Sequence, residues 1–251
     1  MGERLQLLNL WVDLVSMEQS LALVKQLVET GKKPQAIFAI NPPKNFHLRE
    51  DPLLSRTFKE AALLIPDGIG IVLGILFLYG RKINRIPGVE LMLEICKLAA
   101  EEGYKIFVYG SKEELNKKAV INLTKIYPGL KIVGRSNGFV QEADMLSLID
   151  KINESKAEII FLALGSPKQE KWFATHRSKL TTVRVCQGVG GSLDLVAGKV
   201  KRAPQIWQRL GLEWLYRVLD DPNKFKRLRF FPPFVILLLK EKFRIMMRPM
   251  P

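Results

Sequence analysis

The chain has 251 residues, of which 47% are hydrophobic and 25% charged, a balance typical of a folded globular protein rather than a disordered one. Its formal net charge of +14 indicates an anionic partner, such as nucleic acid, a phosphorylated substrate or an anionic membrane surface. The two cysteines, Cys96 and Cys186, are too few for a disulfide framework and lack metal-ligand spacing, which favours a reducing compartment.

The first third of the chain alternates short apolar runs with amphipathic stretches. Asp51 suits the N-cap of a helix and Pro52 its first position, while the pair Pro42-Pro43 indicates a break after a strand. The apolar run at 69–79 is too short to span a bilayer and is expected to form a buried helix. In chain order the predicted elements are a strand at 9–15, a helix at 17–29, a strand at 36–41, a helix at 51–61, a strand at 62–66 and a helix at 69–79.

The same alternation continues almost to residue 198. The clearest strand is 158–164, where the letters IIFLAL include no polar residue and run into Gly165-Ser166-Pro167. After a basic loop at 81–87, the predicted elements are a helix at 89–102, a strand at 105–109, a helix at 113–127, a strand at 131–135, a helix at 143–155, the strand at 158–164, a helix from 168 and a strand at 183–187.

Continuous apolar strands separated by helices are typical of a parallel sheet that is covered on both faces. The sequence therefore predicts a Rossmann-like α/β domain at residues 1–198. Residues 199–251 hold thirteen Lys and Arg against four Asp and Glu, so a net +9 of the total +14 lies in the last fifth of the chain. We expect this segment to form a helical, basic C-terminal appendage.

The ends of the predicted strands carry the most unusual sequences. Ligands of open parallel sheets bind outside the carboxyl ends of the strands. Glycines there let the backbone approach phosphate groups and helix N-termini favour anions, so a nucleotide diphosphate suits such an edge. The strand ends of this kind are Asn41-Pro42, Asp67-Gly68, the segment from Gly165 to Glu170, the segment from Gly188 through Gly190 to Gly191 and, more weakly, Gly110-Ser111.

Several common nucleotide-binding and catalytic motifs are missing from the sequence. It has neither G-x-G-x-x-G after the first strand nor G-x-x-x-x-G-K-[ST], which argues against a dinucleotide enzyme and a P-loop NTPase. His47 and His176 stand alone, so a Ser/His/Asp triad has no support. No cluster of carboxylates indicates a metal site. We therefore expect neither a metal nor a cofactor.

Asp67 is the strongest catalytic candidate, because it ends an apolar strand and precedes an apolar helix in the string IPDGIG. One interpretation is an N-cap of that helix. The other is a general base that deprotonates an acceptor hydroxyl during sugar transfer. In the next loop, Arg81, Lys82 and Arg85 form either a solvated charge run or a group that neutralises phosphate.

Gln169 and Glu170 open the helix that follows the clearest strand. A carboxylate in the first turn of a helix complements the helix dipole, and this alone would explain Glu170. Gln169 is instead a candidate to hydrogen-bond the phosphate or the sugar of a donor.

These residues lie in strings that together resemble one known family. The strings AINPPKNFHLRED, LLIPDGIGIVLG, RIPGVELM, FVYGS, ALGSPKQEKW and QGVGGSLDLVAGKVKRAPQIWQRLGLEWLYR follow one another across nearly the whole chain, with a DP-x-K-x-x-R segment behind them. In this order they are similar to the WecG/TagA/CpsF family of bacterial glycosyltransferases. Each string alone is weak, but the set is highly specific.

The resemblance implies an inverting, metal-independent transfer of N-acetylmannosamine, or of its uronic acid, from UDP to undecaprenyl-diphosphate-linked N-acetylglucosamine. It makes Asp67 the base, Arg85 and Gln169 contacts to donor and phosphate, Asn41 part of the pocket and Asp194 a contact to the nucleotide. One departure is Ala39, where family members often carry Thr. That departure permits a rival hypothesis, a non-catalytic protein that binds nucleotide-sugar or lipid.

The C-terminal appendage mixes aromatic and aliphatic residues with Lys and Arg, which suits an anionic membrane interface. The alternatives are a C-terminal helix packed on the core with a basic outer face, or a nucleic-acid site, for which no module matches. By the resemblance, Arg217, Arg227 and Lys224, the last in place of the usual Arg, neutralise a diphosphate as the appendage covers the active site. We expect a peripheral protein at the cytoplasmic face of the cell membrane with no nucleic-acid partner, and a monomer and a homo-oligomer both stay open.

Overall fold

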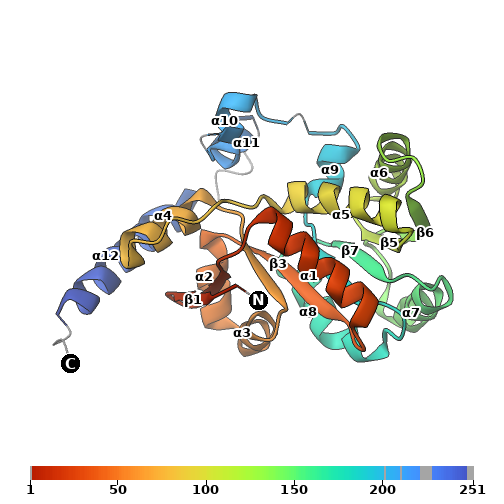
Figure 1. Ribbon diagram of the computed structural model, residues 1–251, viewed down its shortest axis with the longest axis horizontal. Helices are drawn as coiled ribbons and strands as arrows, with labels where there is room; N and C mark the ends of the chain where they lie inside the picture. Colours follow the sequence, from red (N-terminus) through yellow and green to blue (C-terminus); the bar gives the residue numbers. More distant parts are fainter. Residues whose placement is uncertain (1, 201, 210, 221–227, 248–251) are drawn as a thin grey trace.

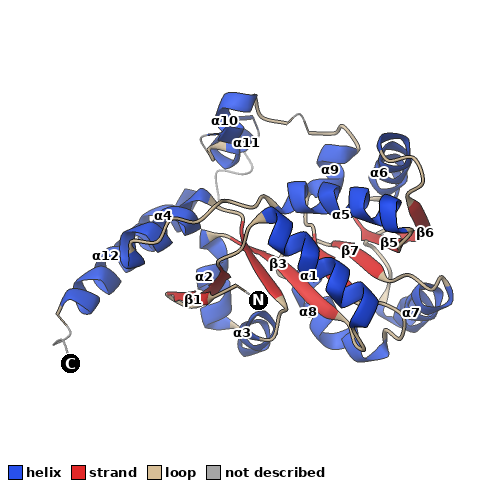
Figure 2. Ribbon diagram, in the orientation of Figure 1, coloured by secondary structure: helices blue, strands red, loops and turns tan. Residues whose placement is uncertain are grey.

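The computed structural model describes residues 2–200, 202–209, 211–220 and 228–247. Its centre is a six-stranded sheet in the order β4-β3-β8-β7-β5-β6, in which every neighbouring pair is parallel (Figures 1 and 2). Because all six strands run the same way, their carboxyl ends lie at one edge of the sheet. The strands are β3 (Gln35–Ile40), β4 (Leu63–Pro66), β5 (Lys105–Gly110), β6 (Lys131–Ser136), β7 (Ile159–Ala163) and β8 (Val185–Gly188).

Helices cover both faces of this sheet, as the continuous apolar strands predict. Side chains from alternate positions of each strand enter two separate apolar cores: Ile37 and Ile65 enter one, while Phe38 and Leu64 enter the other. The Rossmann-like α/β prediction is confirmed. The first core is covered by α1 (Met17–Thr30), α5 (Gly88–Glu102), α6 (Glu113–Ile126) and α9 (Ser192–Val196), and the second by α2 (Pro42–Glu50), α3 (Pro52–Lys59), α7 (Met145–Glu154) and α8 (Lys168–His176), with short 3-10 turns at Glu142–Asp144 and Arg177–Lys179.

Two helices far apart in sequence, α4 (Ile69–Tyr79) and α12 (Phe231–Met246), lie side by side beyond the β4 edge (Figure 1). Two glycines allow the close approach: an added β-carbon on Gly74 would lie 3.4 Å from Leu238, and one on Gly70 would lie 3.9 Å from Phe234. Between α9 and α12 the described chain forms α10 (Gln205–Arg209) and α11 (Glu213–Asp220). The boundary at residue 199 stays a prediction.

The N-terminus differs from the single strand predicted at 9–15. It forms an antiparallel pair, β1 (Arg4–Leu7) and β2 (Leu10–Asp13), outside the main sheet. The chain reverses at Leu8 and Asn9, and Leu8 has a φ of 58°, which is uncommon for a leucine, so Asn9 alone is a weak turn signal in the sequence. Arg4 then donates to both Asp13 carboxylate oxygens, at 2.6 and 2.8 Å, and closes the pair.

Two further predictions are wrong in an instructive way. The Pro42-Pro43 pair begins helix α2 instead of breaking the chain, because prolines are tolerated in a first turn whose N–H groups have no partner within the helix. Helix α4 exists as predicted but is buried on one side only: the side chains of Leu73, Leu76 and Phe77 are 55%, 39% and 41% exposed. By contrast Asp51 caps α3 as expected, accepting from the Leu54 N–H at 3.1 Å.

Candidate active site at the carboxyl edge of the sheet

Asp67 follows the last residue of β4 and is half-buried at the carboxyl edge of the sheet. Its Oδ1 accepts from the N–H of Gly88, the first residue of α5, at 2.9 Å. The N-cap of α4 is Gly68 and makes no side-chain cap bond, so the interpretation of Asp67 as the cap of α4 is wrong. A carboxylate at the N-terminus of α5 instead lies where the helix dipole favours negative charge.

Gly88 connects Asp67 to the centre of the sheet. Its carbonyl accepts from the Nε2 of Gln187 at 3.0 Å, and Gln187 is buried on the central strand β8. Its second neighbour is Ala39 of β3, whose Cβ would lie 3.5 Å from a β-carbon added to Gly88. Residue 39 therefore adjoins the peptide group that holds the Asp67 carboxylate. Gln187 opens the string QGVGGSLDL, but sequence reasoning assigned it no role.

The other predicted contacts on this side of the sheet come together around Asp67. Ile86 donates its N–H to the carbonyl of Pro66 at 3.0 Å, which ties the basic loop with the half-buried Arg85 to the end of β4. Asn41 lies on the neighbouring strand end, where its Cβ would be 3.3 Å from a β-carbon added to Gly68. Asn41 precedes helix α2 without a side-chain cap bond. The structure thus brings Asn41, Asp67 and the Arg85 loop to one place.

A buried ion pair joins α2, the helix that follows β3, to α8, the helix that follows β7. Lys44 Nζ and Glu170 Oε1 are 2.9 Å apart, with 4% and 0% of the two residues exposed. Glu170 is therefore more than a complement to the dipole of α8, because its carboxylate neutralises a buried cation. Lys44 also lies over the ring of Phe58, at 4.8 Å from its centroid. Sequence reasoning assigned Lys44 no role, because it took Pro42-Pro43 only as the break after a strand.

Gln169 connects this ion pair to the glycine-rich turn after β8. Its Nε2 donates to Glu170 Oε1 at 3.3 Å and its Oε1 accepts from the Gly190 N–H at 3.0 Å. Gly190 has a φ of +52°, and added β-carbons on Gly190 and Gly191 would meet nothing within 4 Å, so the turn presents open backbone. The structure therefore shows that Gln169 holds the glycine-rich turn in place through the Gly190 N–H. A direct bond from Gln169 to a donor stays a prediction.

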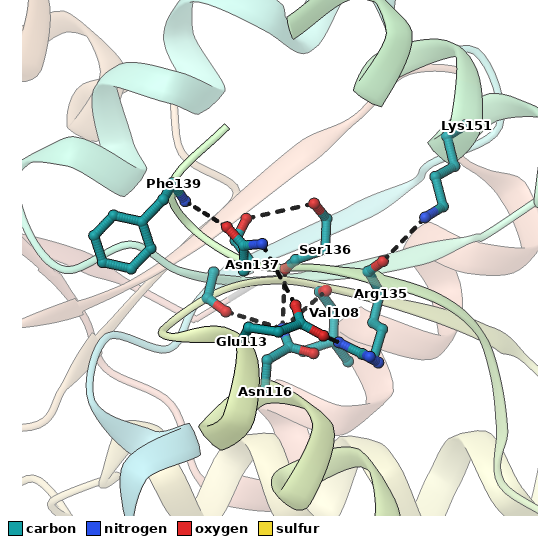
Figure 3. Close-up of polar contacts among 9 residues, drawn as sticks. Val108, Glu113, Asn116, Arg135, Ser136, Asn137, Phe139 and Lys151 are labelled. Carbon is teal, nitrogen blue, oxygen red and sulfur yellow. Dashed lines mark hydrogen bonds and ion pairs between the residues drawn. The ribbon is translucent and has the colours of Figure 1, made fainter. Parts of the chain in front are cut away.

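The ends of β5 and β6 are held by Asn116 of α6 (Figure 3). Its Nδ2 donates to the carbonyls of Gly110 and Ser136, at 2.9 and 3.0 Å. Gly110 has a φ of +123°, and a β-carbon there would lie 2.5 Å from the carbonyl carbon of Ala163, so only glycine fits. Next to it, Ser111 Oγ donates to Asp194 Oδ1 at 3.0 Å. Gly110 and Asp194 thus share this edge with Gly190.

The segment after α9 returns to the same edge. Arg202 forms an ion pair with Glu90 in the first turn of α5. Between α10 and α11, a β-carbon on Gly211 would lie 2.9 Å from the Cβ of Ile69, two residues after Asp67. The described part of the appendage therefore contacts the N-terminus of α4. Lys224 and Arg227 lie outside the described residues, as does the side chain of Arg217, which is on α11.

Comparison with known proteins decides the family. A family model described as "Glycosyl transferase WecG/TagA/CpsF family" matches residues 5–248. A protein of Bacillus subtilis strain 168, named N-acetylglucosaminyldiphosphoundecaprenol N-acetyl-beta-D-mannosaminyltransferase, is 34% identical over 82% of this chain and 79% of its own length. Proteins of the same name from Bacillus spizizenii and Staphylococcus aureus MRSA252 are 33% and 36% identical, over 82% and 74% of this chain and 79% and 72% of theirs. The chain belongs to the WecG/TagA/CpsF family of glycosyl transferases.

For a glycosyl transferase of this family, the carboxyl edge offers the carboxylate of Asp67, a cationic loop and open glycine backbone, whereas the two cysteines are unreactive. Burial raises the pKa of the Cys96 thiol to about 12 and that of Cys186 well above its ordinary value, so neither supplies a thiolate near neutral pH. In the described part of the chain, no three His, Cys, Asp or Glu side chains lie close enough to hold a metal ion. The catalytic candidate is Asp67.

Proposed function

We propose that the protein is an inverting hexosyltransferase. It moves N-acetylmannosamine, or a related sugar such as its uronic acid, from a UDP-sugar to undecaprenyl-diphosphate-linked N-acetylglucosamine in the synthesis of a teichoic acid or another cell-surface polysaccharide. Support comes from the family match over residues 5–248 and from the activity in the names of relatives that are 33–36% identical. The observation that carries the proposal is the position of Asp67, held by a helix N-terminus at the edge where parallel-sheet enzymes bind their ligands.

In the proposed reaction, Asp67 acts as the general base. A sugar hydroxyl of the acceptor attacks the anomeric carbon of the donor, its proton passes to the Asp67 carboxylate, and the bond from the anomeric carbon to the UDP oxygen breaks. UDP leaves with the electron pair of that bond. Because the attacking and leaving oxygens lie on opposite sides of the carbon, a single displacement inverts its configuration. The Gly88 N–H holds the carboxylate toward the edge while the proton is transferred.

In this proposal the remaining predicted site residues bind the diphosphate or the donor. Positive side chains stabilise the departing diphosphate, which gains negative charge in the transition state. These are Arg85 on the loop after α4 and Arg217, Lys224 and Arg227 in the appendage. Asn41, Gln169 and Asp194 contact the donor, and Gly110 does so through its backbone. The open backbone at Gly190 leaves room for the phosphates and the nucleotide.

We place the reaction at the cytoplasmic face of the cell membrane, with the appendage bound to the anionic lipid surface. The acceptor in the relatives' names is a lipid, and each Lys or Arg near an anionic surface contributes about 1 kcal/mol of attraction. No described helix is both long and apolar enough to cross a bilayer. A peripheral arrangement accounts for the basic appendage that follows the catalytic domain.

The experiment that tests this proposal is a panel of UDP-sugars with a diphospholipid acceptor that ends in N-acetylglucosamine. We expect release of UDP that depends on the acceptor, and a disaccharide product whose new anomeric centre is inverted by NMR. Reactions without acceptor measure hydrolysis and serve as controls. Tight binding of a UDP-sugar without turnover for any member of the panel would overturn the proposal in favour of the non-catalytic binding protein that Ala39 permits.

A further inference from the structure

Helices α4 and α12 both expose large apolar side chains. On α4 these are Leu73, Leu76 and Phe77, which are 39–55% exposed. On α12 the exposed fractions are 49–72%. So much exposed apolar surface on two adjoining helices marks an interaction site. We name this surface the two-helix apolar face; its residues are Leu73, Leu76, Phe77, Val235, Ile236, Leu239, Phe243 and Met246.

The contacts between the two helices fix their relative direction. Gly70 at the start of α4 is close to Phe234, and Gly74 one turn later is close to Leu238. One turn further still, Lys242 Nζ donates to the Leu78 carbonyl at 3.4 Å. The contacts advance together along both chains, so α4 and α12 run parallel to each other and side by side.

One stripe of exposed residues on each helix points to the same side of this pair. At 3.6 residues per turn, Leu73 and Phe77 lie about 90° around α4 from the line of contact with α12, and Leu76 lies further round, away from α12. On α12, Val235, Leu239 and Phe243 lie about 90° from that line in the opposite sense. Two parallel neighbours turned in opposite senses face the same direction. The two stripes therefore make one continuous surface, and Lys242 lies between them with its Nζ 5.7 Å from the centre of the Phe77 ring.

Cations surround this apolar face. Lys82 and Lys240 are exposed, and Arg81 and Arg244 are half or more exposed while paired with Glu3 and Glu241. We infer that the two-helix apolar face inserts into the interfacial layer of an anionic membrane, so that the catalytic domain itself, through α4, contacts lipid. At about 16 and 24 Å, the two helices are too short to span the bilayer core and suit its interface.

This inference deepens the proposed function and rests on it for its role in catalysis. Helix α4 begins two residues after Asp67, and Leu73 lies about 6 Å along the helix axis from its first residue, Ile69. A membrane contact through α4 therefore fixes the height of the carboxylate above the lipid. A sugar that hangs from a diphosphate at the membrane surface then meets the base without leaving the bilayer. Binding through the appendage alone would leave this height undefined.

The test is flotation with vesicles of phosphatidylglycerol and phosphatidylcholine. The variant Leu73→Glu/Leu76→Glu changes two exposed positions of α4 and touches no proposed site residue. Its matched control, Ile121→Glu/Leu146→Glu, adds the same charge at exposed positions of α6 and α7. We expect the α4 variant to bind vesicles at least about tenfold more weakly than the control, because apolar burial is lost. Equal binding by the two variants would overturn the inference.

A second measurement covers the case in which the α4 variant does not fold. Leu73→Cys labelled with a polarity-sensitive dye should shift to the blue when vesicles are added, whereas Leu146→Cys should not; the native Cys96 and Cys186 are buried and escape the label. No shift at residue 73 would overturn the inference. So would sedimentation showing that the α4 variant turns a dimer into a monomer with unchanged vesicle binding, because the face would then join two copies.

Activity separates this inference from the proposed function. With a short, water-soluble acceptor the α4 variant should turn over like the wild type, and with a long-chain acceptor in vesicles it should be slower. If the wild type transfers no sugar to either acceptor, the proposed function fails, while the vesicle experiment still decides the membrane contact. If the α4 variant keeps full activity on the long-chain acceptor in vesicles, the role of the α4 contact in catalysis is excluded.

Discussion

The buried pair Lys44–Glu170 gives the sharpest stability prediction. In Lys44→Met the Glu170 carboxylate loses its cation while remaining fully buried, and among the described residues it keeps the Gln169 amide as its hydrogen-bond partner. Leaving one charge of a buried pair alone costs about 3–5 kcal/mol. Lys171 offers a matched control, because its pair with Asp51 at 2.6 Å is much more exposed, at 48% and 24%. We expect Lys171→Met to cost at most about 1 kcal/mol.

The assay is urea unfolding at neutral pH, followed by circular dichroism. A second substitution makes the expected result more specific: Lys44→Met/Glu170→Gln should be more stable than Lys44→Met alone by about 2 kcal/mol or more, because a neutral amide replaces the unpaired charge. The Gln169 amide keeps an acceptor in this double variant, so we expect UDP affinity near that of the wild type. A cost below about 1 kcal/mol for Lys44→Met, or no rescue by the second change, would refute the reasoning.

Three further predictions test separate parts of the fold. Asp51→Ala removes the cap of α3 and should lower the free energy of unfolding by about 1 kcal/mol in the same urea assay; no loss would contradict the cap. Gly74→Val places a branched side chain within 3.2–3.4 Å of Leu7 and Leu238 and should cost about 1–3 kcal/mol, whereas an unchanged midpoint would mean that α12 is not seated there. Burial lowers the pKa of His176 from its ordinary 6.5, so the folded protein takes up this proton only at lower pH than the unfolded chain. The stability that His176 contributes is therefore complete above pH 6.5 and is lost as the pH falls through the folded pKa. His176→Phe should therefore lower the free energy of unfolding less at pH 5.5 than at pH 7.5, and equal losses at the two pH values would contradict this.

The sheet and its functional edge could be predicted because their signals are local. An apolar run that stops at Asp67-Gly68 or at Gly188 indicates both a strand and its end within a few residues. The cap at Asp51 is equally local. The parallel arrangement then follows from the alternation with helices, and it brings the strand ends to one edge without any knowledge of tertiary contacts.

What the sequence did not reveal depends on partners far along the chain. Lys44 meets a carboxylate 126 residues away and Gln187 meets a carbonyl 99 residues away, so neither role has a local signature. The prediction that helix α4 is buried failed for another reason. Its residues are apolar on every side, so no periodicity shows which side faces solvent, and only the docking of α12 along Gly70 and Gly74 decides it.

The most direct measurement of the central claim is turnover by Asp67→Asn. The amide oxygen of asparagine can still accept from the Gly88 N–H, so the fold should survive, but the side chain cannot take up the acceptor proton. We predict that kcat falls by about 10²–10⁴-fold while UDP binding by calorimetry stays close to wild type, with Asp150→Asn on the exposed side of α7 as the unchanged control. Turnover within about tenfold of the wild type would show that another group removes the proton, and Asp67 would lose the role assigned to it.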